Sequence, residues 1–105
     1  MFDVITIGTA TRDVFLKTAQ LKVLKDPEHL KKIGFTAGEA ECFALGGKLE
    51  IDEPVLTVGG GATNSAVTFA RHGLKTASLI TIGKDDNGRE IVNQLKSENI
   101  KVLPT

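Results

Sequence analysis

The pattern of hydrophobic residues changes along the chain. Residues 2–8, FDVITIG, and residues 75–83, KTASLITIG, are short apolar runs that contain β-branched residues and end in glycine. A third run begins at residues 100–105, IKVLPT. Such runs are typical of strands buried on both faces, as in a parallel sheet. We therefore expect three strands of this kind.

Between these runs, two segments carry apolar residues at helical spacing. Residues 63–72 predict a helix that ends at Gly73, and residues 86–98 predict a second helix with Asp85 as its N-cap. The expected buried faces are Ala66, Phe69 and Ala70 in the first helix and Ile91, Val92 and Leu95 in the second. Because strands and helices alternate, the predicted fold class is α/β, a partial Rossmann-like parallel sheet with right-handed crossovers.

An inserted segment, residues 13–57, interrupts this alternation with short polar and apolar stretches. We expect it to form a small β-sheet between two core segments, residues 1–12 and 58–105, of a single unit. Its expected elements are one or two strands in 12–24, a short helix in 26–34 capped by Asp26 and ended by Gly34, a loop over 36–41, strands on both sides of Gly46–Gly47, and an alternating strand over Lys48–Asp52.

Charge and composition exclude several classes of function. Lys plus Arg equal Asp plus Glu, so the formal net charge is zero, and we expect neither nucleic acid nor a membrane surface as partner. No basic leader and no apolar window of membrane-spanning length is present. The single cysteine, Cys42, has no partner in the chain for a disulfide, which favours a cytoplasmic location. His29 and His72 have no metal-ligand pattern beside them, so no metal site is expected.

The candidate chemistry lies at VGGGATNSAVTFARHG, residues 58–73. Gly59, Gly60 and Gly61 stand where a strand leads into a helix, and parallel α/β sheets bind ligands at such places. Bare main chain and the free N–H groups of the helix favour a phosphate or a polyhydroxylated sugar, and Asn64 adds an amide in the first helical turn. Neither G-x-G-x-x-G nor a Walker A motif is present. The alternative is that the glycines only permit a tight turn.

The same stretch, GGGATNSAVTFARHGLKTASLITIG, closely resembles the N-terminal signature of the ribokinase-like (PfkB) carbohydrate kinases. ITIGTATRDVFL resembles the first strand of that family followed by its sugar-binding aspartate, here Asp13. GKDDNGREIVNQL is similar to the family's glycine-aspartate turn, with Asn87 where an aromatic residue is common. The positions that match the signature are Gly59, Gly60, Ala62, Asn64, Ala66, Gly73 and Gly83.

The resemblance implies a substrate site formed by Asp13, Gly60, Gly61 and Asn64, which contact hydroxyl groups of a sugar or nucleoside. The alternatives are a turn aspartate that bonds its own backbone for Asp13 and an ordinary helix-start residue for Asn64. Asp85 is expected mainly to cap its helix, and Arg12 and Lys84 to be solvated.

The resemblance also implies that residues 13–57 form the family's β lid, and that a full-length member uses ATP and Mg to phosphorylate a sugar hydroxyl. The family's later glycine-rich turn with the catalytic aspartate has no match, since the last glycine is Gly88. We therefore expect no catalytic residue and no cofactor in this chain, which would be inactive alone as the acceptor-binding and lid portion of a kinase. The alternative function is a non-catalytic oligomeric binding or assembly module on the same scaffold.

A three-stranded sheet and a one-sided lid leave apolar surface and sheet edges open. We therefore expect a homo-oligomer through the lid or the open sheet edge, or a complementary C-terminal half as partner. A truncated form, one subunit of a split enzyme and a natural fragment are all compatible with the sequence. The apolar residues expected to seek a partner are Leu45, Leu49, Ile51, Val55 and the phenylalanines.

Overall fold

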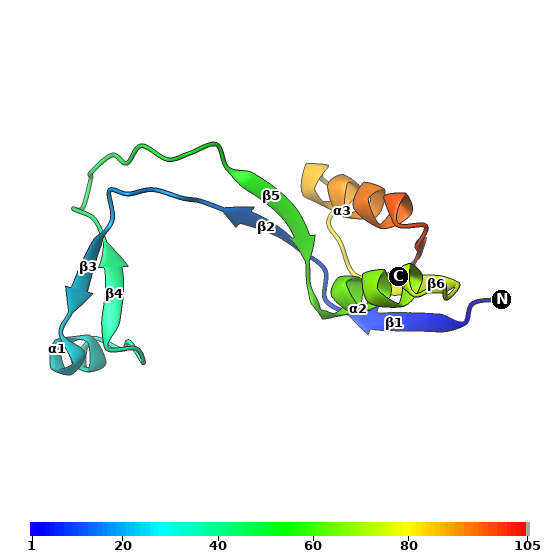
Figure 1. Cartoon of the computed structure of the whole chain (residues 1–105), viewed down its shortest axis with the longest axis horizontal. Coiled ribbons are helices and arrows are strands. Elements are labelled where there is room, and N and C mark those ends of the chain that lie inside the picture. Colours follow the sequence, from blue (N-terminus) through cyan, green and yellow to red (C-terminus); the bar gives the residue numbers. More distant parts are fainter. Residues whose placement is uncertain (105) are drawn as a thin grey trace. The chain divides into compact units, whose positions relative to one another are not determined.

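A computed structural model describes residues 1–104 of the chain. Contacts divide the chain into two compact units, one formed by Met1–Phe15 with the chain from Val55 onward, and one formed by Leu16–Pro54. The smaller unit is three residues shorter at each end than the expected insertion, residues 13–57. In order (Figure 1), the elements are β1 (Val4–Gly8), β2 (Thr11–Phe15), β3 (Lys22–Lys25), α1 (Pro27–Lys32), β4 (Glu39–Cys42), β5 (Val55–Gly59), α2 (Gly61–Arg71), β6 (Thr76–Ile80), α3 (Asp86–Ser97) and β7 (Lys101–Leu103).

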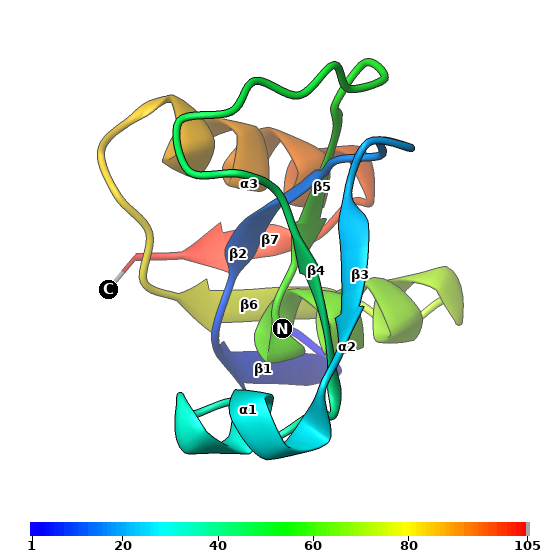
Figure 2. The ribbon, with the colours of Figure 1, turned by 90° about the vertical axis from the view of Figure 1, so that its left-hand side faces the viewer.

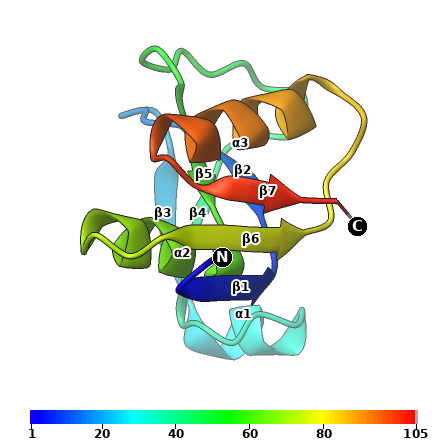
Figure 3. The ribbon, with the colours of Figure 1, turned by 90° about the vertical axis from the view of Figure 1, so that its right-hand side faces the viewer.

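The larger unit contains the predicted parallel sheet, in the strand order β1-β6-β7. Val4 pairs with Thr76 at the start of the first ladder, and Ala77 pairs with Lys101 in the second. Figure 3 shows the three arrows running in the same direction, with α3 linking β6 to β7. The prediction of an α/β fold with a parallel sheet is therefore confirmed.

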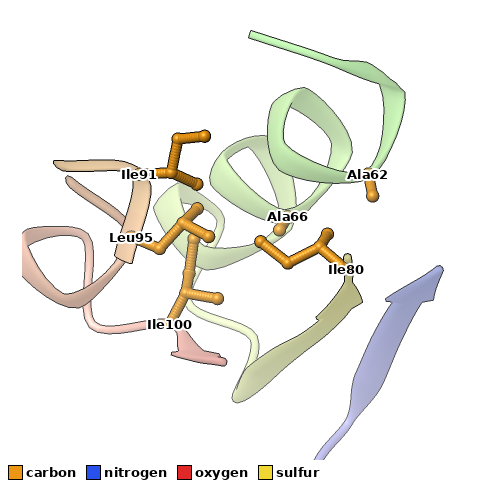
Figure 4. Packing of buried hydrophobic residues seen from close by; sticks show 6 residues of the cluster. All are labelled: Ala62, Ala66, Ile80, Ile91, Leu95 and Ile100. Atoms are coloured by element: carbon orange, nitrogen blue, oxygen red, sulfur yellow. The ribbon is translucent and has the colours of Figure 1, made fainter. Parts of the chain in front are cut away.

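The core lies between this sheet and the helices α2 and α3. Figure 4 shows its six fully buried residues, contributed by α2, β6, α3 and the turn before β7, namely Ala62, Ala66, Ile80, Ile91, Leu95 and Ile100. The predicted burial of Ala66, Ile91 and Leu95 is confirmed. Phe69 is 37% exposed, so its predicted burial is wrong. The buried row of α2 runs through Ala62 and Ala66, which are one helical turn apart, and Phe69 lies beside this row.

The opposite face of the sheet is open. Ile5 and Ile7 are 51% and 73% exposed, so the prediction that the first strand is buried on both faces is wrong. The alternate residues Val4, Thr6 and Gly8 share the other face, which is turned toward the core. Thr6 is buried there, and its hydroxyl donates to the carbonyl of Ala62 (2.9 Å) and lies 2.8 Å from the hydroxyl of Ser78. The apolar run therefore reflects one covered face and one apolar face that no described residue covers.

The predicted helix boundaries are largely confirmed. Asp85 accepts a hydrogen bond from the amide of Gly88 (2.8 Å), and Asp26 accepts one from the amide of His29 (3.1 Å). Gly34 and Gly73 follow the ends of α1 and α2 with φ values of 100° and 85°. These left-handed conformations explain why glycine ends both helices.

Strands β2 and β5 form an antiparallel ribbon in the larger unit. Thr11 pairs with Gly59, and Asp13 pairs with Thr57. Paired residues and every second residue share a face, so Thr11, Asp13, Thr57 and Gly59 lie on the same side of the ribbon. Val58, on the other side, packs against the core cluster. The ribbon therefore places Asp13 beside the last residue of β5, Gly59.

The smaller unit is an antiparallel pair, β3 and β4, with α1 between the two strands in sequence (Figure 2). Its one fully buried hydrophobic side chain is Leu30 of α1, and Lys25 pairs with Glu39 across the strands at 3.4 Å. The prediction of a loop over residues 36–41 is wrong in its second half, because β4 begins at Glu39. The expected strand at 12–24 is confirmed as two strands, β2 and β3.

The predicted strands at residues 43–54, including Lys48–Asp52, are absent from the structure as described. This stretch makes a single main-chain hydrogen bond to residues 17–20, from the amide of Asp52 to the carbonyl of Lys17 (2.9 Å). The main chain of Glu50 is bonded by side chains instead. The hydroxyl of Thr18 donates to its carbonyl, and the side-chain oxygen of Gln20 accepts from its amide. Side chains that bond the backbone compete with a ladder, which is why alternation alone was misleading here.

Within residues 1–104, no helix has the length and apolar character needed to cross a bilayer.

Candidate functional site at the joint of β5 and α2

The three consecutive glycines have three different structural roles. Gly59 is the last residue of β5, Gly60 is the N-cap of α2, and Gly61 is the first residue of the helix. Gly60 alone has a positive φ, with φ 102° and ψ 153°. Essentially only glycine adopts this combination of φ and ψ. Of the three glycines, Gly60 is therefore the one whose conformation requires glycine.

The first two amides of α2 are already used within the chain. The amide of Gly61 donates to the hydroxyl of Thr9, and the amide of Ala62 donates to the carbonyl of Thr9, each at 3.1 Å. The expectation that these N–H groups are free for a ligand is therefore wrong. Thr9 was missed because it lies in the connection between β1 and β2, far from the glycines in sequence. Its polar side chain just after a strand-ending glycine is the one signal that could have identified it.

The carboxylate of Asp13 lies over Gly59. A Cβ at Gly59 would stand 2.5 Å from Oδ2 of Asp13 and 3.0 Å from Oγ1 of Thr11, so any larger residue there would require the Asp13 carboxylate to move. Asp13 is half-buried, and within residues 1–104 its carboxylate has no hydrogen bond and no ion pair. It lies inside β2, so the alternative of a turn aspartate that bonds its own backbone is wrong.

Gly60 and Gly61 differ in their surroundings. The side-chain position of Gly60 is filled by the main chain of Thr9 and Ala10, with Cα of Ala10 2.8 Å from an ideal Cβ. The side-chain position of Gly61 is nearly empty, with only the hydroxyl of Thr9 at 3.9 Å. Tight packing therefore explains Gly60, whereas Gly61 presents bare main chain to open space.

Asn64 lies in the first turn of α2 and is exposed. It lines a groove of about 370 Å³ between α2 and α3, and this lining does not include Asp13, Gly60 or Gly61. The structure therefore brings Asp13 to the glycines and places Asn64 on the groove. The groove residues are Val58, Thr63, Asn64, Val67, Thr68, Arg71, Gln94, Leu95 and Glu98.

An ion pair contributes the charged groups of this groove. Nε of Arg71 donates to Oε2 of Glu98 (3.0 Å) and Nη2 donates to Oε1 (2.5 Å), in a two-pronged geometry. The hydrogen bond from Arg71 lowers the pKa of Glu98, and the same contact raises the pKa of Arg71. Both groups stay charged at neutral pH and neutralise each other. The rest of the lining offers hydroxyls, amides and apolar groups, which suit an uncharged polar molecule.

The remaining candidates have local roles. Asp85 caps α3 as expected, and Lys84 is exposed. Nδ1 of His72 lies 2.8 Å from the carbonyl of Thr68, and Cys42 is half-buried in β4. In the part of the chain that the structure describes, no three His, Cys, Asp or Glu side chains gather so that they could hold a metal ion. Arg12 is half-buried in β2 rather than fully solvated.

Comparison with known families gives one match. A family profile described as "pfkB family carbohydrate kinase" matches residues 27–104, which is most of the chain. No curated protein matches the chain.

The environments of the glycines predict different effects of alanine. Gly60→Ala forces a side chain into main-chain atoms at a positive φ, so we expect the free energy of unfolding to fall by about 1–3 kcal/mol or more. Gly61→Ala meets open space at a helical position and should be neutral or stabilising by up to about 1 kcal/mol. Urea unfolding followed by circular dichroism measures both. Equal losses at Gly60 and Gly61 would contradict the structure of this joint.

Proposed function

Since the chain belongs to the pfkB family of carbohydrate kinases, we propose that it binds the acceptor substrate of such a kinase, a sugar or a nucleoside, at the joint of β5 and α2. In this proposal Asp13, Gly60, Gly61 and Asn64 are the substrate-binding residues. The observation that carries it is the half-buried carboxylate of Asp13, which lies over the bare main chain of Gly59 without a partner among the described residues.

Asp13 is suited to hold hydroxyl groups. Two carboxylate oxygens accept hydrogen bonds from two neighbouring hydroxyls of a sugar ring, and such charge-assisted bonds are stronger than neutral ones. Partial burial shields these bonds from water and raises their strength. Strand β2 and its pairing with β5 hold the carboxylate in place, so little freedom is lost on binding.

The other three residues supply shape and a second polar contact. The contact of Gly60 with Thr9 and Ala10 fixes the path of the main chain, and Gly61 leaves the surface without a side chain. The side chain of Asn64 makes no hydrogen bond within residues 1–104, so its amide is available as donor and acceptor. A ligand that reaches from Gly61 toward the groove between α2 and α3 would engage it.

Phosphoryl transfer needs more than acceptor binding. It depends on positioning together with metal and cationic groups that stabilise the charge on the transferred phosphoryl. We propose that ATP and Mg are held by residues outside this chain, that the smaller unit, Leu16–Pro54, acts as a lid on the acceptor, and that the chain alone is catalytically inactive. The free thiol of Cys42 fits a cytoplasmic setting.

A second candidate function is a non-catalytic oligomeric binding or assembly module on the same scaffold. The observation that favours it is the amount of exposed apolar surface. Ile7 on the open sheet face is 73% exposed, and Phe35 and Leu45 in the smaller unit are 51% and 105% exposed. Surfaces of this kind mark interaction sites. The partner is either a second copy, through the lid or an open sheet edge, or a complementary C-terminal half.

Substrate binding is tested by titration calorimetry against pentoses, hexoses and nucleosides. Asp13→Asn should weaken the binding of the best ligand about ten- to hundredfold, because a hydrogen bond to a charged group contributes about 1.5–3 kcal/mol. Asn64→Ala should weaken it about two- to tenfold. Asp3→Asn, just before β1, and Asn93→Ala, on α3, are the matched controls at exposed positions of the larger unit, and should change affinity less than about twofold. No saturable heat with any of these compounds up to about 10 mM would contradict the proposal.

Catalysis is tested by incubating the chain with Mg-ATP and the same compounds while ADP release is measured. We expect no release above background, because the phosphoryl donor site lies outside the chain in this proposal. Adding a separately produced C-terminal half of a pfkB family kinase should restore turnover if the chain is one half of a split enzyme. Failure to restore it would favour the assembly module, and robust turnover by the chain alone would contradict the proposed division of the chemistry.

Assembly is tested by sedimentation velocity at micromolar concentration, where we expect at least a dimer. Ile7→Ser removes apolar surface from the open sheet face, and a Phe43→Ser, Leu45→Ser double variant removes it from the smaller unit. The variant that produces a monomer identifies which unit associates. A folded monomer of the unmodified chain would contradict association.

A further inference from the structure

A further cavity of the larger unit lies away from the joint of β5 and α2. It measures about 620 Å³ and is lined by Phe2, Lys75, Thr76, Lys96, Asn99, Ile100, Lys101 and Val102, all in the larger unit. Thr76 and Lys101 are the first residues of β6 and β7, so the cavity lies at the amino ends of the strands. Ligands of parallel α/β sheets normally bind at the carboxyl ends. The proposed acceptor site does not account for this cavity.

The floor of the cavity is built from fixed parts of the fold. Thr76 and Ile100 are each 2% exposed, and β6 and β7 pair directly beside them. Asn99 has a φ of 62°, and the turn is closed by a hydrogen bond from the amide of Ile100 to the carbonyl of Leu95 (2.9 Å). This is the left-handed ending common to helices, in which asparagine replaces glycine. The volume falls within the range of small-molecule sites.

Three lysines provide the charge. The side chains of Lys75, Lys96 and Lys101 line this one cavity in a chain whose formal net charge is zero. None of the three forms an ion pair within residues 1–104. Each has a weaker local role at most: Lys75 lies over the ring of Phe2 (5.9 Å to its centroid), and Lys96 lies in the last turn of α3. Neither contact neutralises the ammonium charge.

Asp3 and Glu98 are the acidic residues next in sequence to the lining residues Phe2 and Asn99. The carboxylate of Asp3 accepts a hydrogen bond from the main-chain amide of Lys75 at 2.7 Å. Glu98, next to Asn99 in sequence, is held by both prongs of Arg71. Arg71 neutralises Glu98, whereas Asp3 keeps its charge beside Lys75, so the three lysines face one uncompensated carboxylate. The surface is therefore net positive, and such a concave basic surface attracts multiply charged anions.

The chemistry of the lining narrows the class of ligand. Phosphate esters carry about −1.5 to −2 charges at neutral pH, and lysine binds phosphate as a point charge. Phe2, Ile100 and Val102 add apolar surface, which favours a ring attached to the charged group over a bare ion. We propose that this cavity binds a phosphate monoester carried on a ring, the chemistry that sugar phosphates and nucleoside monophosphates share.

A titration of the ¹⁵N-labelled chain followed by amide chemical shifts tests the site directly. The probes are adenosine monophosphate, ribose 5-phosphate and inorganic phosphate, with adenosine as the uncharged control. We expect saturable shifts at Thr76 and residues 99–102 with at least one of the two phosphate esters, weaker shifts with inorganic phosphate, and none there with adenosine. The stronger ester identifies the source of the phosphate. Absence of saturable shifts at these amides up to about 10 mM ester would overturn the proposal.

Substitution of the lysines tests the cause of binding. Lys75→Gln, Lys96→Gln and Lys101→Gln together should weaken ester binding about three- to 150-fold, since each exposed ion pair contributes about 0.2–1 kcal/mol. Lys22→Gln, Lys32→Gln and Lys48→Gln remove the same charge from exposed positions of the smaller unit, and should change binding less than about twofold. Equal weakening in both variants would mean that binding depends only on the net charge of the chain, and it would overturn the proposed site.

Two further measurements keep the test valid if the triple variant is poorly folded. Lys96→Gln and Lys101→Gln alone should each weaken binding about twofold or more, and added NaCl should weaken binding to the unmodified chain. An affinity for the ester that does not change with added NaCl would contradict a site formed by lysines. Adenosine shifts at Asp13 or Asn64 would report on the acceptor site instead, so the two proposals can fail separately.

Discussion

The contact between Thr9 and the start of α2 is the interaction on which the joint of β5 and α2 depends. One threonine supplies two acceptors, its hydroxyl and its carbonyl, to the first two amides of the helix. This contact is possible only because Gly60 has no side chain and adopts a positive φ. The first N–H groups of any helix lack partners within the helix, and here Thr9 supplies partners for two of them. The contact also joins the β1–β2 connection to the β5–α2 connection. Together with the pairing of β2 and β5, it places Asp13 beside the joint.

This constraint changes the chemical character expected of the joint. A glycine run before a helix is usually associated with free amides that hold a phosphate, but here Thr9 occupies the first two amides. The acceptor that remains is the carboxylate of Asp13, and an acceptor favours a donor-rich ligand such as a polyol over an anion. Positive charge gathers instead at the amino ends of β6 and β7. The two ends of the sheet are therefore suited to different ligands.

The sequence predicted the elements that depend on local signals and on periodicity. The cap at Asp85, the glycine after α2 and the buried strand β6 follow from side chains within a few residues of each other, and the structure confirms them. It could not predict features that depend on distant contacts. The use of the α2 amides by Thr9 joins residues more than fifty positions apart, and the exposure of Ile5 depends on what covers a sheet face. The clean alternation at Lys48–Asp52 misled because alternation says nothing about whether a partner strand is present.

The close approach of the Asp13 carboxylate to Gly59 is hard to explain by stability alone. A half-buried carboxylate without a partner loses hydration and gains no bond within the described residues, so it weakens the fold. Gly59, the last residue of β5, adds to that cost, because glycine loses more backbone entropy on folding than alanine. A threonine at position 13 and an alanine at position 59 would suit an antiparallel ribbon better. Two unfavourable residues that fit each other, at the end of a strand that leads into a helix, are typical of a surface shaped for a ligand.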